Sequence, residues 1–233
     1  MLKRCFILLL LSFIGASAFG QDSLAVKVSD PNYREDQFYV GVTYNLITRV
    51  PSNINLKGLS GGVNFGFIRD MPLNKQRNVA IGLGLGLSFD RYGETLFIGE
   101  SQNEQTLFSS LDETIEYDVN RFSTATVEIP IEFRWRTSTE SEYKFWRIYT
   151  GARLGYVYWY QSFFSQPNNE VSQTDIPEFQ QLQLAATLSV GYSTFNFYAN
   201  YSVTPFFTNA VIGDTQEEIA FAPLKIGIIF YIL

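Results

Sequence analysis

The feature that most constrains this chain is an alternation of apolar and polar side chains that recurs in eight segments. The clearest segment begins at Val79, where Val, Ile, Leu and Phe alternate with Ala, Gly and Ser as far as Phe89. A period of two residues is typical of a β-strand. A tilted strand of about ten residues is long enough to cross the hydrocarbon core of a bilayer. The pattern therefore predicts membrane-spanning strands.

The remaining segments complete a closed sheet. We place the eight strands at residues 38–48, 58–68, 79–90, 121–136, 144–160, 179–192, 195–204 and 224–233. Single-chain bacterial barrels have an even number of strands, and eight satisfies that requirement. We therefore predict an all-β protein, an eight-stranded antiparallel up-and-down transmembrane β-barrel with a filled polar lumen. A secreted soluble β-sandwich, which also alternates, is the rival fold.

Connection lengths and aromatic residues predict the orientation of this barrel. The connections after the second, fourth and sixth strands are short, and those after the third, fifth and seventh are long. Outer-membrane barrels have short periplasmic turns and long outer loops, so we expect both barrel termini on the periplasmic side. Aromatic residues form two expected girdles. The inner girdle contains Phe38, Phe67, Trp135, Trp146, Tyr192 and Phe195, and the outer one Tyr44, Phe89, Tyr156, Tyr158 and Tyr201.

The first 20 residues have the features of a secretory signal peptide. Lys3 and Arg4 precede the apolar run 6–14, which is too short to span a membrane as a helix. Cleavage is expected after Ala18 or Gly20, and we favour Gly20. We expect a polar periplasmic lead-in at 21–36 and the outer-membrane barrel at 37–233.

Composition removes several classes of function. The sole cysteine, Cys5, lies within the predicted signal peptide, and the chain contains no histidine. The mature chain then offers no thiol nucleophile, no Ser-His pair and no Cys or His ligand for a metal. Removing Lys3 and Arg4 leaves 15 basic residues (17 − 2) against 23 acidic ones, a net charge of −8. We therefore expect no enzyme activity, no cofactor, no metal and no nucleic-acid partner.

Charged residues on the inward faces of the fourth and fifth strands form the most conspicuous cluster. If these strands pair with residue numbers summing to 279, Glu132 lies opposite Arg147; a sum of 281 places Glu128 opposite Arg153. Buried charge is tolerated when it is paired, and an eight-stranded barrel is filled by side chains. We therefore predict a structural charge network in the lumen rather than an acid–base pair. Its members are Glu128, Glu132, Arg134, Arg136, Arg147 and Arg153.

The long loops carry acidic and apolar residues. Their acidic residues lack the spacing of a calcium loop and predict a solvated acidic surface. Apolar loop residues either fold back on the rim or meet a partner. Our candidates for partner contact are Phe97, Phe108, Phe206, Phe207 and Phe221. Gly82, Gly84 and Gly86 lie on one strand face, where we expect them to make room in a narrow barrel or to permit bending rather than to cradle a phosphate.

Three stretches carry a family resemblance. The segments 62–75, 82–88 and 225–232 resemble small outer-membrane barrels of Bacteroidota, often grouped as PorT-like or "porin family" proteins. The last segment also resembles the β-signal read by the barrel-assembly machinery, although it ends in Leu233 rather than Phe. The residues that match this signal are Lys225, Gly227, Phe230 and Ile232. The family includes a component linked to type IX secretion and gliding, and the resemblance implies a similar role here.

These observations predict a non-enzymatic outer-membrane barrel. We favour an accessory or structural subunit that docks a larger secretion or assembly complex through its loops or its lipid-facing wall. Its expected partners are outer-membrane lipid, the barrel-assembly machinery and another outer-membrane protein. One alternative is a small porin for ions or solutes, and another is an adhesion protein that acts through acidic outer loops.

Overall fold

The computed structural model describes residues 36–101, 103, 105–112, 114–137, 145–213 and 215–232. The predicted signal peptide, most of the predicted lead-in, Lys144 and Leu233 lie outside these ranges. The regular structure within these ranges consists of eleven strands. They are β1 (Gln37–Thr48), β2 (Gly61–Pro72), β3 (Val79–Gly93), β4 (Leu96–Glu100), β5 (Thr106–Ser110), β6 (Val119–Arg136), β7 (Trp146–Gln166), β8 (Asn169–Gln173), β9 (Leu182–Tyr192), β10 (Phe195–Ser202) and β11 (Ala222–Ile232).

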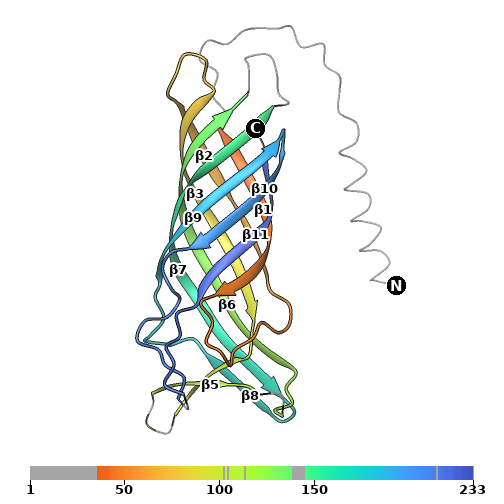
Figure 1. Ribbon diagram of the computed structural model, residues 1–233, viewed down its shortest axis with the longest axis vertical. Coiled ribbons are helices and arrows are strands. Elements are labelled where there is room, and N and C mark those ends of the chain that lie inside the picture. Colours follow the sequence, from red (N-terminus) through yellow and green to blue (C-terminus); the bar gives the residue numbers. More distant parts are fainter. Residues whose placement is uncertain are drawn as a thin grey trace, which may run out of the picture. The chain divides into compact units, whose positions relative to one another are not determined.

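Eight of these strands close into an antiparallel barrel. The order around the ring is β6, β3, β2, β1, β11, β10, β9 and β7, and β7 pairs back with β6. The first and last strands therefore lie side by side, with Phe38 opposite Ile232 and Thr48 opposite Ala222. In Figure 1 the short β2–β3 connection is at the top and strands β5 and β8 are at the bottom. We call these the turn end and the loop end. The predicted eight-stranded barrel is confirmed.

The strands that the sequence analysis missed all lie at the loop end. Strands β4 and β5 form a separate hairpin, and β8 pairs with the last five residues of β7. Strands β6 and β7 are the longest, at 18 and 21 residues, and their loop-end halves extend the sheet. The other strands begin or end within about four residues of the predicted positions.

Alternation along the strands separates an apolar outer wall from a polar interior. On β1, Phe38, Val42 and Tyr44 are 55–60% exposed, whereas Gln37 and Asn45, which lie on the other parity, are fully buried. The same contrast holds on β3, where Leu83 and Leu85 face out and Ser88 and Asp90 face in. A protein in water buries such aliphatic rows. Their exposure is the expected pattern for a wall that contacts lipid.

A β-bulge interrupts the alternation of β7. Ala125 on β6 lies opposite Trp159, but the next residue, Thr126, lies opposite Val157, so Tyr158 has no partner. Tyr158 and Trp159 are consequently both exposed, although they are consecutive in the sequence. An extra residue in one strand reverses which parity faces inward beyond it. Phe164 therefore points inward, which a continuous period of two from Trp146 would not predict.

The strands account for all regular elements here. Within the described ranges, no helix is long and apolar enough to cross a membrane.

Candidate functional site

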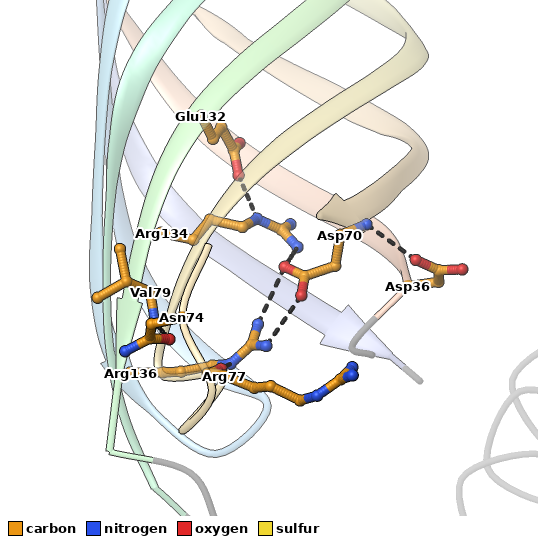
Figure 2. A network of polar contacts seen from close by, with 8 residues as sticks. All are labelled: Asp36, Asp70, Asn74, Arg77, Val79, Glu132, Arg134 and Arg136. Carbon is orange, nitrogen blue, oxygen red and sulfur yellow. Dashed lines mark hydrogen bonds and ion pairs between the residues drawn. The ribbon is translucent and has the colours of Figure 1, made fainter. Parts of the chain in front are cut away.

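Asp70 is the centre of a charge network at the turn end of the lumen (Figure 2). Both of its carboxylate oxygens accept hydrogen bonds from Arg136, at 2.9 and 2.8 Å. Arg134 donates to the same carboxylate from Nη1 at 3.1 Å and reaches Glu132 through Nε at 3.1 Å. The side chains of Asp70, Arg134 and Arg136 are fully buried. A bidentate pair between a carboxylate and a guanidinium fixes orientation as well as charge.

The backbone completes the turn-end network. Arg136 Nε donates to the carbonyl oxygen of Arg77, and Asp36 accepts a hydrogen bond from the backbone N–H of Asp70 (Figure 2). The network thus ties β6 to β2, to the β2–β3 turn and to the start of β1. Its contacts stabilise the end of the barrel as a unit.

A second ion pair lies deeper in the lumen. Arg153 Nη1 donates to Glu128 Oε2 at 2.7 Å, and both residues are buried. The guanidinium also lies 4.9 Å from the ring centre of Tyr39 and 5.1 Å from that of Tyr198. Aromatic faces attract cations, most strongly where water is excluded. Arg153 is therefore held by rings from β1 and β10 as well as by a carboxylate from β6.

A third pair lines the same cavity as the second. Lys225 Nζ donates to Asp90 Oδ2, and Asp90 also accepts hydrogen bonds from Asn45 and Ser88. These residues come from β11, β3 and β1. The lumen therefore contains paired charges along its length, and the pairs of Asp70, Glu128 and Asp90 join different strands.

The structure corrects both predicted registers of the fourth and fifth predicted strands. Below the bulge, paired residue numbers in β6 and β7 sum to 283, so Glu132 lies opposite Gly151 and Arg147 lies opposite Arg136. Arg153 and Glu128 still meet, but along a diagonal rather than directly across. Glu132 contacts Arg134 on its own strand instead of Arg147. Arg147 lies over the ring of Phe145, with its guanidinium carbon 4.4 Å from the ring centre.

Glycines on β3 create the space that these side chains occupy. A Cβ atom on Gly82 would lie 2.7 Å from Nε of Arg134, and one on Gly86 would overlap the hydroxyl of Tyr39. Both glycines sit on the inward face of the strand. The prediction that they make room in a narrow lumen is confirmed.

Among the described residues, the lumen contains a small cavity between the charged pairs. It has a volume of about 40 Å³ and is lined by Asp90, Glu128, Arg153 and Lys225, among other residues. A buried water needs roughly 10–15 Å³ of such space, so the cavity fits a few water molecules. It does not fit a solute the size of a sugar.

An aromatic core fills the barrel interior at the loop end. Phe122 on β6 lies at its centre, with ring centroids 5.3 Å from Phe179, 5.8 Å from Phe206 and 5.7 Å from Phe207. We call this cluster the plug. It contains Ile47, Ile54, Tyr92, Leu96, Ile98, Phe108, Phe122, Val157, Ile176, Phe179, Phe206, Phe207, Ala210, Ile212, Ile219 and Phe221.

The plug corrects the predicted partner contacts. Phe108, Phe206, Phe207 and Phe221 are at most 5% exposed and belong to the plug. Of the two outcomes considered for the apolar loops, folding back on the rim is the one observed for these four side chains. Phe97 is half-buried, and its ring packs at 5.0 Å against Phe164 of β7.

Glu94 is an acidic residue at the edge of the plug. It is 2% exposed, and its Oε2 accepts a hydrogen bond of 2.8 Å from the backbone N–H of Leu96. Burial among apolar side chains disfavours the charged form. This desolvation raises the pKa of Glu94 to about 8, against the smaller opposing effect of the Leu96 hydrogen bond. Glu94 is therefore protonated at neutral pH.

The outer surface of the loop end is acidic. Asp112 is exposed there, and hydrogen bonds from Thr114 hold the pKa of its carboxyl below the usual value. The other exposed acidic residues of this surface are Glu100, Glu116, Asp118, Glu170, Asp175 and Glu218. Beside them lies a hollow of about 760 Å³, lined by Asn55, Lys57, Thr95, Asp112 and Thr215 among others. We call the plug with this covering surface the head.

The residues of the predicted assembly signal lie on both faces of β11. Lys225 points into the lumen, whereas Phe230 and Ile232 are exposed on the outer wall. Gly227 packs against the backbone of Val42 and Thr43, where a Cβ atom would overlap Val42. The signal itself stays a prediction. Among the described residues, no cluster of three or more His, Cys, Asp or Glu side chains could hold a metal ion.

The sequence pattern did not predict the role of Asp70 or the existence of the plug. Asp70 lies in the stretch that we predicted to be a turn, because Pro72 and Asn74 follow it; in the structure β2 continues through it to Pro72. Its position two residues beyond Ile68 on the inward parity was the available signal. The plug gave no such signal, since its loop residues follow no period.

Comparison with known proteins gives one family match. Residues 19–208 match the family described as outer membrane protein beta-barrel domain. No curated protein matches the chain.

Similar solved structures include two of Ail, the attachment invasion locus protein of Yersinia pestis. In the complex with the heparin analogue sucrose octasulfate, the match has 14% identity and a TM-score of 0.34, covering 85% of this chain and 99% of Ail. The match with Ail alone has 14% identity and a TM-score of 0.35, and it covers 84% of this chain and 97% of Ail.

Proposed function

Because the chain belongs to the outer membrane protein beta-barrel domain family, we propose that it is a non-enzymatic barrel that holds a binding head at the cell surface. The barrel is the membrane anchor, and the head contacts the partner. The observation that carries this proposal is the plug, which gives the loop end a core of its own.

The closed interior argues for an anchor rather than a pore. The plug fills the loop end, and the lumen below it has a cavity of about 40 Å³. Steady single-channel currents from the pure protein in a planar bilayer would favour the small-porin alternative. We expect none above the bare-membrane background.

A preformed head supports binding by the loops. The connections that follow β1, β3, β7 and β10 contribute residues to one core, so their outer surfaces are held in fixed positions. Loops that are ordered before binding lose less conformational entropy in a complex. We place the loop end outside the cell, as short-turn and long-loop asymmetry predicts.

The charge of the head indicates the class of partner. Its exposed acidic residues, among them Glu116, Glu170 and Asp175, give this surface a negative potential. Complementary charge steers association and selects partners. We therefore propose a basic protein surface as the partner, which corresponds to the adhesion alternative.

A photo-crosslinking side chain at the exposed Ser172 of β8 tests this proposal in native cells. We expect a discrete adduct whose yield falls several-fold in the Glu170→Lys, Asp175→Lys variant and at high salt. The matched control is the same crosslinker at Lys75, which is exposed at the turn end. An adduct that is insensitive to both changes would contradict binding through head charge.

A role as an accessory subunit is the second candidate, and apolar side chains on the head favour it. Leu56, Leu107 and Val211 are 37–40% exposed at the loop end, outside the lipid-facing rows of the barrel strands. Exposed apolar side chains of this kind suit a stable contact with another protein. This corresponds to the secretion or assembly role implied by the PorT-like resemblance. An adduct partner that stays in carbonate-washed membranes would favour this role, and one released by the wash would favour surface adhesion.

A further inference from the structure

Within the described barrel strands, arginine is the only charged residue type on the outward face of the wall. The outward positions of the eight barrel strands carry Arg69 near the turn end, and Arg91 and Arg121 near the loop end. None of these positions carries Asp or Glu. In a chain with a net charge of −6, the acidic residues are thus absent from the surface where the arginines lie.

Arg91 and Arg121 are close neighbours on this wall. In the pairing of β3 with β6, Arg91 lies opposite Ser123, and Arg121 lies opposite Gly93. The two arginines are therefore diagonal neighbours on one face, about 7–8 Å apart at Cα and within reach of each other's long side chains. Two guanidinium groups this close repel unless an anion lies between them.

Neither arginine has a carboxylate partner within the described part of the chain. Arg91 Nε is buried and has no hydrogen-bond partner there. The contact of the Arg121 guanidinium is with the ring of Phe163, 4.8 Å from its centre. The wall arginines differ in this respect from the lumen arginines, because Arg134, Arg136 and Arg153 all contact carboxylates. The wall arginines have donors free for a ligand from outside the chain.

An apolar groove runs from Arg91 along the wall. Its volume is about 670 Å³, and it crosses β11, β1, β2 and β3. Gly61, which lies opposite Arg91 on β3, leaves a gap in the floor of this groove because it has no side chain to fill it. Leu59, Val63, Phe89 and Ile226 form its sides. An acyl chain fits such a surface, whereas a water-soluble anion gains nothing from it.

We propose that Arg91 and Arg121 bind the phosphate of an anionic membrane lipid whose acyl chain lies in this groove. Guanidinium groups pair with phosphate through charge-assisted hydrogen bonds. Arg91 lies one outward position beyond Phe89, which we predicted to belong to the outer aromatic girdle, where lipid headgroups begin. Assigning this lipid to the outer leaflet rests on the orientation in the proposed function; the binding site does not.

Native mass spectrometry of the folded full chain released from detergent micelles tests this site. The probes are dioleoyl phosphatidic acid, dioleoyl phosphatidylcholine and glycerol phosphate. We expect phosphatidic acid to be retained in preference to the other two. Each arginine contributes about fivefold, so Arg91→Gln with Arg121→Gln should lower this preference by about 25-fold.

Three controls keep the result decisive. Arg69→Gln, at the other end of the wall, should leave the preference unchanged, and Arg91→Lys with Arg121→Lys should keep most of it. Heat-modifiable gel mobility confirms that each variant is folded. An unchanged preference in the double Gln variant would overturn the proposal. Equal retention of glycerol phosphate, or a dimer of the chain in place of lipid adducts, would overturn it as well.

The outcome of this lipid-binding test is independent of the outcome of the crosslinking test of the proposed function. Loss of lipid preference would leave crosslinking at Ser172 unaffected, and loss of the crosslinked adduct would leave lipid retention unaffected.

Discussion

The barrel interior is filled in two chemically opposite ways. In the membrane-spanning part, Arg134, Arg136 and Arg153 are buried against carboxylates and tyrosine rings. At the loop end, the plug around Phe122 is almost entirely apolar. The same strands supply both regions, since Phe122 and Arg134 both lie on the inward face of β6.

The two regions depend on different properties of their residues. A buried ion pair needs a partner at a specific position, and removing one partner leaves an uncompensated charge. An apolar core needs volume and shape, and it accepts many side chains of similar size. The lumen should therefore be sensitive to changes of charge at constant size, and the plug to changes of size.

Glu94 breaks this rule in the plug and gives the largest expected effect. Its pKa is raised from 4.5 to about 8 in the folded chain, so folding takes up a proton between these pH values. The stability that results is fully present below pH 4.5 and is lost as the pH rises through about 8. The loss is on the order of 5 kcal/mol. Glu94→Gln should remove this pH dependence.

Limited proteolysis of the head measures the Glu94 effect. Wild type and Glu94→Gln should be equally protected near pH 4.5, and the variant should be better protected near pH 9. Comparing both proteins at each pH cancels the pH dependence of the protease. Equal protection at pH 9 would mean that Glu94 is solvated.

Asp70→Asn tests the charge dependence of the lumen at nearly constant size. It removes the bidentate carboxylate of Arg136 and one of the two carboxylates that contact Arg134, which should destabilise the barrel by about 4 kcal/mol. The measurement is the urea midpoint in lipid vesicles, followed by tryptophan fluorescence. Asp112→Asn on the exposed head is the control. Similar midpoints for both variants would show that the turn-end charges are hydrated.

Phe122→Ala tests the volume dependence of the plug. The ring contacts three other phenylalanines, and its loss should cost about 3 kcal/mol, near the lower limit for a buried Phe because rim loops can partly collapse. Phe122→Leu should cost less than half as much. Hydrogen exchange should localise the loosening to the loop end, and loosening that extends to β1 would make the two regions one cooperative unit.

Phe97→Ala should have the smallest effect. Its half-buried ring has one aromatic partner, Phe164, so the expected loss is about 1 kcal/mol. Thermal unfolding in detergent measures it, with the neighbouring exposed Glu100→Gln as the reference. A loss as large as that of Phe122→Ala would mean that the β4–β5 hairpin holds the plug in place.

The sequence predicted the wall better than the interior. Strand number and the outward rows follow from a period of two, which the lipid-facing residues from Val79 to Phe89 obey without exception. The contact between Arg153 and Glu128 was also expected, but its register was not, because parity allows every odd sum of residue numbers. The inward position of Asp70 was not predicted, because the nearby Pro72 indicated a turn at this point of the chain. The plug was not predicted because its contacts join loops far apart in the chain, and local patterns carry no information about such contacts.

The bulge at Tyr158 has a genetic consequence. Odd-numbered residues of β7 face the lumen before the bulge, whereas even-numbered residues face it beyond the bulge, as far as Gln166. An in-frame deletion of the Tyr158 codon would restore uninterrupted alternation and keep Phe164 facing inward, because Trp159 would then take the outward position that follows Val157. Most substitutions at Tyr158, and even the loss of that residue, should therefore leave the facing of the distal third of the strand unchanged.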